Sequence, residues 1–133
     1  MAENKPKIPD SELEVLEALW SIDQGTVRDC LNQLKWSGKS WSYATVSTLL
    51  HRLEEKGLVE CDREGFAHTY KATVSRPAVV NRKLEHLIDT VYGQEPGLLV
   101  VHLLKSYKLS SEHQGEIKKI LEDLSTNDEL TAE

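Results

Sequence analysis

The segment 41–74 constrains the fold most strongly, because its pattern is that of an amphipathic helix followed directly by a two-stranded hairpin. Ser42 is predicted to cap the start of the helix, since a serine oxygen can accept from the free N–H groups of a first turn. Lys56 and Gly57 are predicted to end it. The i, i+3, i+4, i+7 spacing of one buried stripe is carried by four apolar residues, Val46, Leu49, Leu50 and Leu53.

A hairpin is predicted after this helix. The segments 58–63 and 66–74 are rich in β-branched and aromatic residues, and Glu64 and Gly65 lie between them as a turn. A helix followed at once by such a hairpin is the arrangement of a winged helix, in which the hairpin is the wing.

Two further helices are predicted ahead of this segment. Ser11 with Glu14 forms the pattern of a capping box for the first, whose apolar stripe is Leu13, Leu16, Leu19 and Trp20. Thr26 with Asp29 caps the second, whose inward face is Val27, Cys30, Leu31 and Leu34. Three short helices and a hairpin predict a mainly α fold, a winged helix-turn-helix domain over residues 1–74.

A helical domain is predicted over residues 75–124. Ser75 and Pro77 have the pattern of a helix start, and Ser111 with Gln114 is predicted to cap the last helix. Three helices of this length bury too little of their own apolar surface, so a second copy of the chain is expected to cover the excess. The residues predicted to form this dimerisation surface are Leu84, Leu87, Ile88, Val91, Leu99, Leu103, Ile117, Ile120, Leu121 and Leu124.

The end of the chain and its overall charge add two expectations. Residues 125–133 are polar and acidic and are predicted to be a flexible tail. The formal net charge is −6. This charge argues against a nucleic-acid-binding protein, because proteins of that class carry a basic patch. A local positive face is still expected, because six basic residues follow the second predicted helix or lie at its end: Lys35, Lys39, Arg52, Lys56, Arg63 and Lys71.

Several classes of protein are not indicated. Cys30 and Cys61 are too few and too far apart for a metal knuckle, and the five histidines lack the spacing of ligands on one helix, so no metal or cofactor is expected. There is no phosphate loop or nucleophile elbow, which argues against an enzyme with catalytic residues. Without a signal peptide or an apolar run of membrane-spanning length, the chain is expected to be cytoplasmic and away from membranes.

The run from Ser42 to Val59, with its Thr-Val-Ser-Thr-Leu-Leu register, resembles the penicillinase-repressor family, as do Leu19-Trp20 in the first helix and Tyr92-Gly93 after the fourth. That family includes the beta-lactamase, methicillin-resistance and copper-responsive repressors. The resemblance covers nearly the whole chain. It implies a homodimeric repressor that binds a pseudo-palindromic operator on double-stranded DNA.

The resemblance also implies a means of release, with a regulatory protease or sensor as a further partner. In the penicillinase repressors an Asn-Phe pair in the fifth helix is cut, whereas His102-Leu103 stands at the matching place here. The copper repressors bind metal through a cysteine-rich tail, but no cysteine follows Cys61. The signal that releases this chain therefore stays unidentified.

Side chains on the polar face of the third helix are expected to read DNA. The short side chains of Ala44, Thr45, Ser47 and Thr48 can approach base edges and thymine methyl groups. Phosphate contacts are expected from Ser42, Tyr43, Arg52, Lys39 and Arg63. The alternative is a winged-helix module that binds proteins and not DNA, which the acidic charge suits and which salt-sensitive duplex binding would exclude.

Overall fold

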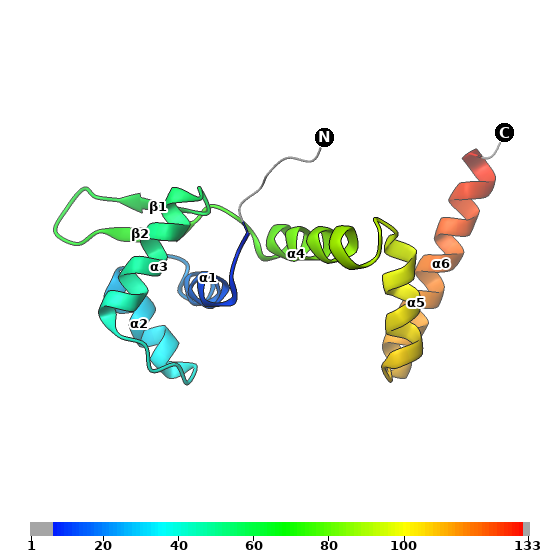
Figure 1. Ribbon diagram of the computed structural model, residues 1–133, viewed down its shortest axis with the longest axis horizontal. Coiled ribbons are helices and arrows are strands. Elements are labelled where there is room, and N and C mark those ends of the chain that lie inside the picture. Colours follow the sequence, from blue (N-terminus) through cyan, green and yellow to red (C-terminus); the bar gives the residue numbers. More distant parts are fainter. Residues whose placement is uncertain (1–6, 132–133) are drawn as a thin grey trace. The chain divides into compact units, whose positions relative to one another are not determined.

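The computed structural model describes residues 7–131, with side chains as far as residue 127 (Figure 1). The chain divides into two compact units, one ending at Val80 and one beginning at Asn81. The predicted domain boundary, before Ser75, lies six residues earlier in the chain. The difference arises because Val79 is buried in the core of the first unit, so the first turn of the following helix belongs to that unit.

The first unit contains three helices and a two-stranded antiparallel sheet, as expected for a winged helix-turn-helix (Figure 1). The predicted fold class is confirmed. The elements are α1 (Asp10–Ile22), α2 (Val27–Trp36), α3 (Tyr43–Glu55), β1 (Val59–Asp62) and β2 (Thr69–Ala72).

One hydrophobic core joins these elements. All four stripe residues predicted on α3 are buried in it, together with the inward residues of α2 and Leu16 and Leu19 of α1. Trp20 packs against the core from its edge, where its indole N–H donates a hydrogen bond to the carbonyl of Val74 at 2.9 Å. The periodic apolar positions of the sequence are therefore the positions that hold α3 in place.

The helix caps agree with the sequence patterns on α2 and α3 but not on α1. Thr26 and Asp29 form the predicted capping box, each side chain accepting from the other's backbone N–H. The predicted capping box of Ser11 and Glu14 is wrong. The helix begins two residues earlier than predicted, at Asp10 after Pro9, so Ser11 lies inside the first turn and no side chain caps the helix.

The hairpin is shorter than predicted. Strands β1 and β2 pair from Val59 with Ala72 to Asp62 with Thr69, and a loop over residues 63–68 replaces the predicted turn at Glu64 and Gly65. Gly65 has φ +96°, a conformation in which side chains with a Cβ are strained. The predicted turn residues lie within this loop, but the ends of the strands are set by pairing across the sheet.

Two backbone hydrogen bonds join the hairpin to the loop between α1 and α2. The N–H of Gly25 donates to the carbonyl of Tyr70 at 3.0 Å, and the N–H of Tyr70 donates back to the carbonyl of Gly25 at 2.7 Å. Tyr70 itself is buried in the core. The β2 strand is thereby fixed to the loop between α1 and α2.

The second unit is helical, and no side chain between residues 81 and 127 is fully buried. Its elements are most of α4 (Arg76–Val91), then α5 (Pro96–Ser106) and α6 (Ser111–Thr131). The cap of α6 lies one residue before the predicted one, because the Ser110 hydroxyl accepts from the N–H of His113 at 3.1 Å. The helix also continues beyond Ser125, through much of the segment predicted as a tail.

Cys30 should resist alkylation in the folded protein while Cys61 reacts. Cys30 is fully buried, and burial raises the pKa of its thiol from 9.0 to about 12, so little thiolate forms at pH 8. Cys61 is partly exposed on β1. Mass spectrometry after timed iodoacetamide treatment should find one fast modification, and that modification should be absent in Cys61→Ser. Equal rates at both thiols would contradict the packing of α2.

Candidate nucleic-acid interface

The outward face of α3 is made of small polar side chains. Ala44, Thr45 and Thr48 are exposed and Ser47 is partly exposed, on the side opposite the buried stripe. None of these four carries a long side chain, so a partner could come close to the helix backbone. The structure therefore brings together on one face all four residues predicted to contact bases.

Hydroxyl groups organise the start of α3. The Ser42 oxygen accepts from the N–H of Thr45 at 3.1 Å, which confirms the predicted cap, and the two side-chain oxygens lie 3.0 Å apart. One hydroxyl of this pair donates to the other. The hydroxyls of Ser42 and Thr45 thus help to fix the first turn, and both remain exposed.

Arg28 is a candidate binding residue that the sequence analysis missed. Its guanidinium lies over the ring of Tyr43, 5.2 Å from the ring centroid, so a cation from α2 is held at the start of α3. Tyr43 is half exposed, and Arg28 is exposed as well. No local pattern in the sequence could have shown this contact, because it arises from the packing of α2 against α3.

The three cations predicted to contact phosphates have different surroundings. Arg63 donates two hydrogen bonds to the carboxylate of Glu54, at 2.7 and 2.8 Å, and these bonds lower the pKa of Glu54 below its ordinary 4.5. Lys39 lies 3.3 Å from the Glu14 carboxylate in a partly exposed pair. Arg52 is exposed and forms no ion pair with any residue between 7 and 127.

The pair of Arg63 and Glu54 connects the hairpin to α3. Because Glu54 lies in the last turn of α3 and Arg63 follows β1, the bidentate contact fixes the base of the hairpin loop against the helix. No sequence pattern indicates this pairing, because it arises from tertiary contact between residues nine positions apart.

The end of α3 is anchored by a second pair. Lys56 donates to the carboxylate of Glu12 at 2.6 Å and to the carbonyl of Lys7 at 2.7 Å. The Glu12 side chain is 3% exposed and the Lys56 side chain 24%. Lys56 is therefore occupied in holding α3 to α1, and it is not free to serve the local positive face that was expected.

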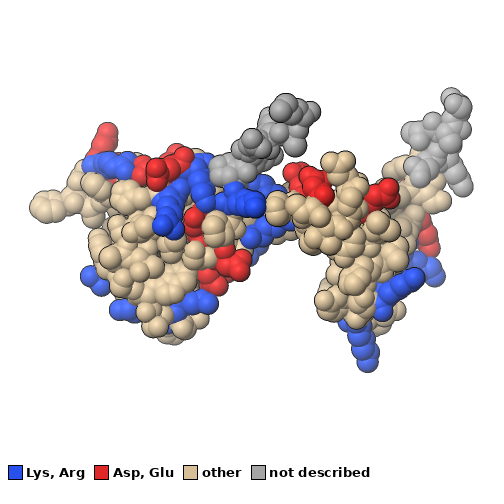
Figure 2. All heavy atoms as spheres, in the orientation of Figure 1, with Lys and Arg blue, Asp and Glu red and all other residues tan. Residues whose placement is uncertain are grey.

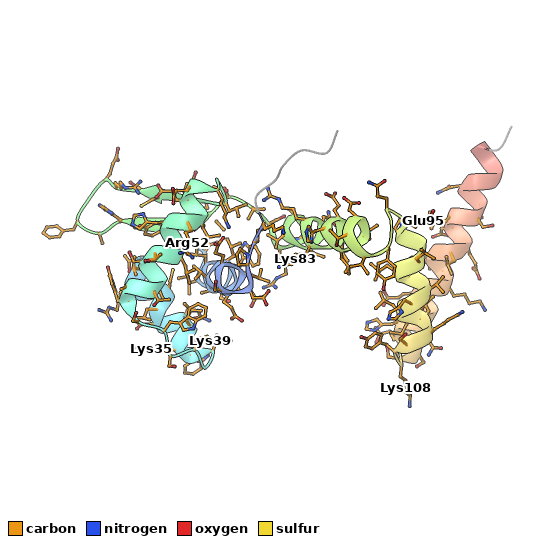
Figure 3. All side chains as sticks on the ribbon, viewed as in Figure 1. Lys35, Lys39, Arg52, Lys83, Glu95 and Lys108 are labelled. Atoms are coloured by element: carbon orange, nitrogen blue, oxygen red, sulfur yellow. The ribbon has the colours of Figure 1, made fainter. Side chains whose placement is uncertain are left out.

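Basic and acidic side chains alternate over the first unit. On the face shown in Figure 2, Lys and Arg lie among Asp and Glu and form no continuous basic surface. Figure 3 shows Lys35 and Lys39 near the loop between α2 and α3, and Arg52 farther along α3. The cations that remain available are thus arranged around the polar face of α3 and do not cover it.

The residues predicted to form a dimer surface are only partly covered within the chain. Leu84, Leu87, Val91, Leu103, Ile120, Leu121 and Leu124 are 38–65% exposed. Ile88, Leu99 and Ile117 are partly buried. All ten belong to α4, α5 or α6 of the helical unit. This is a large apolar surface for a unit in which no side chain between residues 81 and 127 is fully buried.

The part of the chain that the structure describes contains no cluster of three or more His, Cys, Asp or Glu side chains able to hold a metal ion. No described helix combines the length and apolar character needed to cross a membrane.

The sequence is similar to known repressors. The family model described as penicillinase repressor matches residues 8–123. An uncharacterized 16.5 kDa protein of Latilactobacillus sakei is 30% identical over 121 residues, covering 91% of this chain and 82% of that protein. The penicillinase repressor of Bacillus licheniformis is 27% identical over 118 residues, covering 89% of this chain and 91% of that protein.

Among solved structures, the DNA-binding domain of the repressor BlaI is similar to 56% of this chain. That match covers 90% of the domain, with 28% identity and a TM-score of 0.48.

Proposed function

The chain belongs to the penicillinase repressor family, and from this premise we propose that it represses transcription as a homodimer bound to a two-fold symmetric operator. The observation that carries the proposal is the face of α3, where short polar side chains stand opposite a fully buried stripe. An α-helix fits the major groove of B-DNA, and short side chains let its backbone approach the base edges. The proposed location, where such a repressor meets DNA, is the cytoplasm.

Base contacts are assigned to the exposed face of α3. Thr45 and Thr48 are one turn apart on the helix, and their methyl and hydroxyl groups suit a thymine methyl or a base-edge acceptor. Ala44 and Ser47 complete the face, with Ala44 offering apolar contact only. These residues would carry the sequence preference.

Phosphate contacts are assigned to the rim of this face. Arg52 has no ion pair with any residue between 7 and 127 to give up, so it should bind a phosphate at the lowest cost. Arg28 and Tyr43 form a second contact point at the start of α3, where helix N–H groups and Ser42 also favour an anion. Lys39 has a single contact with a partly exposed carboxylate to exchange for a phosphate, whereas Arg63 is held by two hydrogen bonds.

The second unit is proposed to supply the two-fold symmetry. Apolar side chains along α4, α5 and α6 remain exposed in the single chain, and a second copy would bury them in a self-complementary interface. Two copies of α3 would then meet two half-sites on one face of the duplex. A protease or sensor that releases the repressor stays a prediction.

Arg52→Ala is expected to weaken binding to any duplex and to reduce the slope of log affinity against log salt by about one unit, because one phosphate contact is lost. Arg28→Ala should act in the same way. Thr48→Ala should instead leave the salt slope unchanged and alter preference at one base step. Fluorescence anisotropy with labelled duplexes over a salt series measures all three.

Lys108→Ala is the matched control, because it removes an exposed cation from the helical unit. It should leave both the affinity and the slope close to those of the unchanged chain. If Arg52→Ala behaved like Lys108→Ala, the assigned orientation of α3 on DNA would be wrong. If the unchanged chain bound no duplex at low salt, the first unit would be a protein-binding module.

A further inference from the structure

A hollow of about 420 Å³ lies against the outer side of α2 in the first unit. Small-molecule sites in proteins occupy roughly 300–1,000 Å³, so this volume suits a ligand with one small ring. The residues that line the hollow come from the end of α1, the loop after it and α2: Ile22, Gln24, Asp29, Asn32, Gln33 and Trp36. None of them belongs to the polar face of α3 or to the cations around that face.

Trp36 gives the hollow a flat apolar surface. Its exposure is 88%, whereas Trp20 and Trp41 are partly buried and pack against the core. A tryptophan is mostly buried in a typical folded protein, because its ring is large and apolar. The indole of Trp36 adds nothing to the core and is therefore available to a ligand.

The polar side chains of the hollow offer both donors and acceptors. Gln24, Asn32 and Gln33 each carry a carboxamide, which donates through its N–H groups and accepts through its oxygen. In the part of the chain that the structure describes, none of these three side chains forms a hydrogen bond. Asp29 adds a carboxylate, one oxygen of which accepts from the N–H of Thr26 at 3.0 Å. Three neutral groups and one charge thus surround the indole.

The loop between α1 and α2 approaches the hollow closely because residue 25 is glycine. A Cβ at Gly25 would lie 2.8 Å from the Cβ of Asp29 and 2.8 Å from the Cδ1 of Ile22, which is closer than side-chain carbons pack. The two hydrogen bonds between Gly25 and Tyr70 fix this loop to β2. The edge of the hollow is therefore set by folding before any ligand binds, which lowers the entropy lost on binding.

These side chains distinguish between classes of small ligand. The Asp29 carboxylate would repel an anion. A cation would pair with that carboxylate but would leave the N–H groups of all three carboxamides unused. An apolar ligand would cover the carboxamides without replacing their hydrogen bonds to water. A neutral ligand with several hydroxyl groups uses every group, since each hydroxyl both donates and accepts.

We propose that the hollow binds a neutral monosaccharide in its pyranose form, with one C–H face of the sugar ring on the indole of Trp36. The hydroxyl groups of the sugar bind Asp29, Asn32 and Gln33. The face of an indole carries negative charge and the ring C–H groups of a pyranose carry a slight positive charge, so the two surfaces attract. A monosaccharide has about a dozen non-hydrogen atoms, and an open site of this kind should bind it with a dissociation constant of roughly 1–10 mM.

The test uses the full chain labelled with fluorotryptophan and follows its fluorine NMR spectrum during titration with D-glucose, D-galactose or D-mannose. Three tryptophans give three resonances, and Trp36→Phe identifies the one from position 36. At least one of the three sugars should shift this resonance along a saturable curve, and the resonances of Trp20 and Trp41 should stay in place. Sorbitol, which carries hydroxyl groups on an open chain, should shift none of them.

Variants of the lining test the assigned contacts, with binding measured by saturation-transfer NMR on the signals of the sugar. Trp36→Ala should abolish binding, and the double variant Asn32→Ala with Gln33→Ala should weaken it by roughly tenfold, because two hydrogen-bonding side chains are lost. Phe66→Ala is the matched control, since it removes another exposed aromatic side chain of the first unit, outside the hollow. It should bind sugar as the unchanged chain does. Trp36→Ala and Phe66→Ala should both keep the melting temperature, because both side chains are exposed.

Four results would overturn the inference. No saturable shift with any of the three sugars up to about 100 mM would exclude a site of useful affinity. An equal shift with sorbitol would show a general effect of polyols, and unchanged binding in Trp36→Ala would place the sugar elsewhere. A tighter response to methylammonium than to the sugars would assign the hollow to cations. Because no residue of the hollow is assigned to DNA, each of these results leaves the proposed function untouched, and a failure to bind duplex leaves this inference untouched.

Discussion

Lys56→Ala is expected to lower the free energy of unfolding by about 3 kcal/mol, the low end of the range for removing one partner of a buried ion pair. The Glu12 carboxylate is 3% exposed, and without Lys56 it would stay buried and unpaired. The low end applies because the ammonium group is itself 24% exposed and so is partly hydrated. The loss should be measured by urea denaturation.

The double variant Glu12→Gln with Lys56→Ala provides the control. A neutral amide costs less to bury than a carboxylate, so the double variant should be more stable than Lys56→Ala alone. Lys108→Ala, which removes an exposed lysine of the helical unit, should change stability little. If Lys56→Ala were as stable as the unchanged chain, water would reach Glu12 and the pair would not anchor α3.

Leu121→Glu should convert the dimer into monomers and weaken binding to a two-site operator by about a hundredfold or more, because the second half-site no longer gains from its link to the first. Leu121 is 56% exposed on α6, in the apolar stripe with Ile117, Ile120 and Leu124. A carboxylate there would have to be desolvated in the interface. Sedimentation velocity gives the mass, and anisotropy gives the affinity.

Thr126→Glu is the matched variant, since it adds the same charge to an exposed polar position on α6. It should remain dimeric. A half-operator should bind Leu121→Glu nearly as well as it binds the unchanged chain, because α3 is untouched. A dimeric Leu121→Glu with full affinity would place the interface elsewhere.

Local patterns predicted the elements of the first unit well. The buried stripe of α3, its Ser42 cap and its end at Lys56 and Gly57 follow from residues that act within one or two turns. The capping box at Ser11 failed because Pro9 suits the position before a first turn, and the helix began after it. Several residues can compete to start a helix, and only the packed structure selects one.

The partners of the charged side chains could not be predicted from the sequence. Arg63 and Lys56 looked like members of one positive face, but each is paired with a carboxylate brought to it by folding. Arg28 gained its place beside Tyr43 through the packing of α2 against α3. Side chains as long as arginine and lysine reach partners that depend on tertiary structure, so their roles do not follow from spacing.

The apolar stripes of the helical unit were visible in the sequence because periodicity is local. The partner surface that covers these stripes cannot be predicted from periodicity, because it belongs to a second molecule. Side chains such as Leu84 and Leu121 remain exposed in the single chain, so the dimer is a proposal that the Leu121→Glu experiment tests.

Selection of bound duplexes from sheared genomic DNA of the source organism, at low and at moderate salt, tests the central claim most directly. The account predicts recovery of two-fold symmetric sites, with half-sites about one helical turn apart or a multiple of it, and weaker binding at higher salt. Recovery of no sequence above background at either salt would contradict it, and α3 and the hairpin would then serve to bind protein.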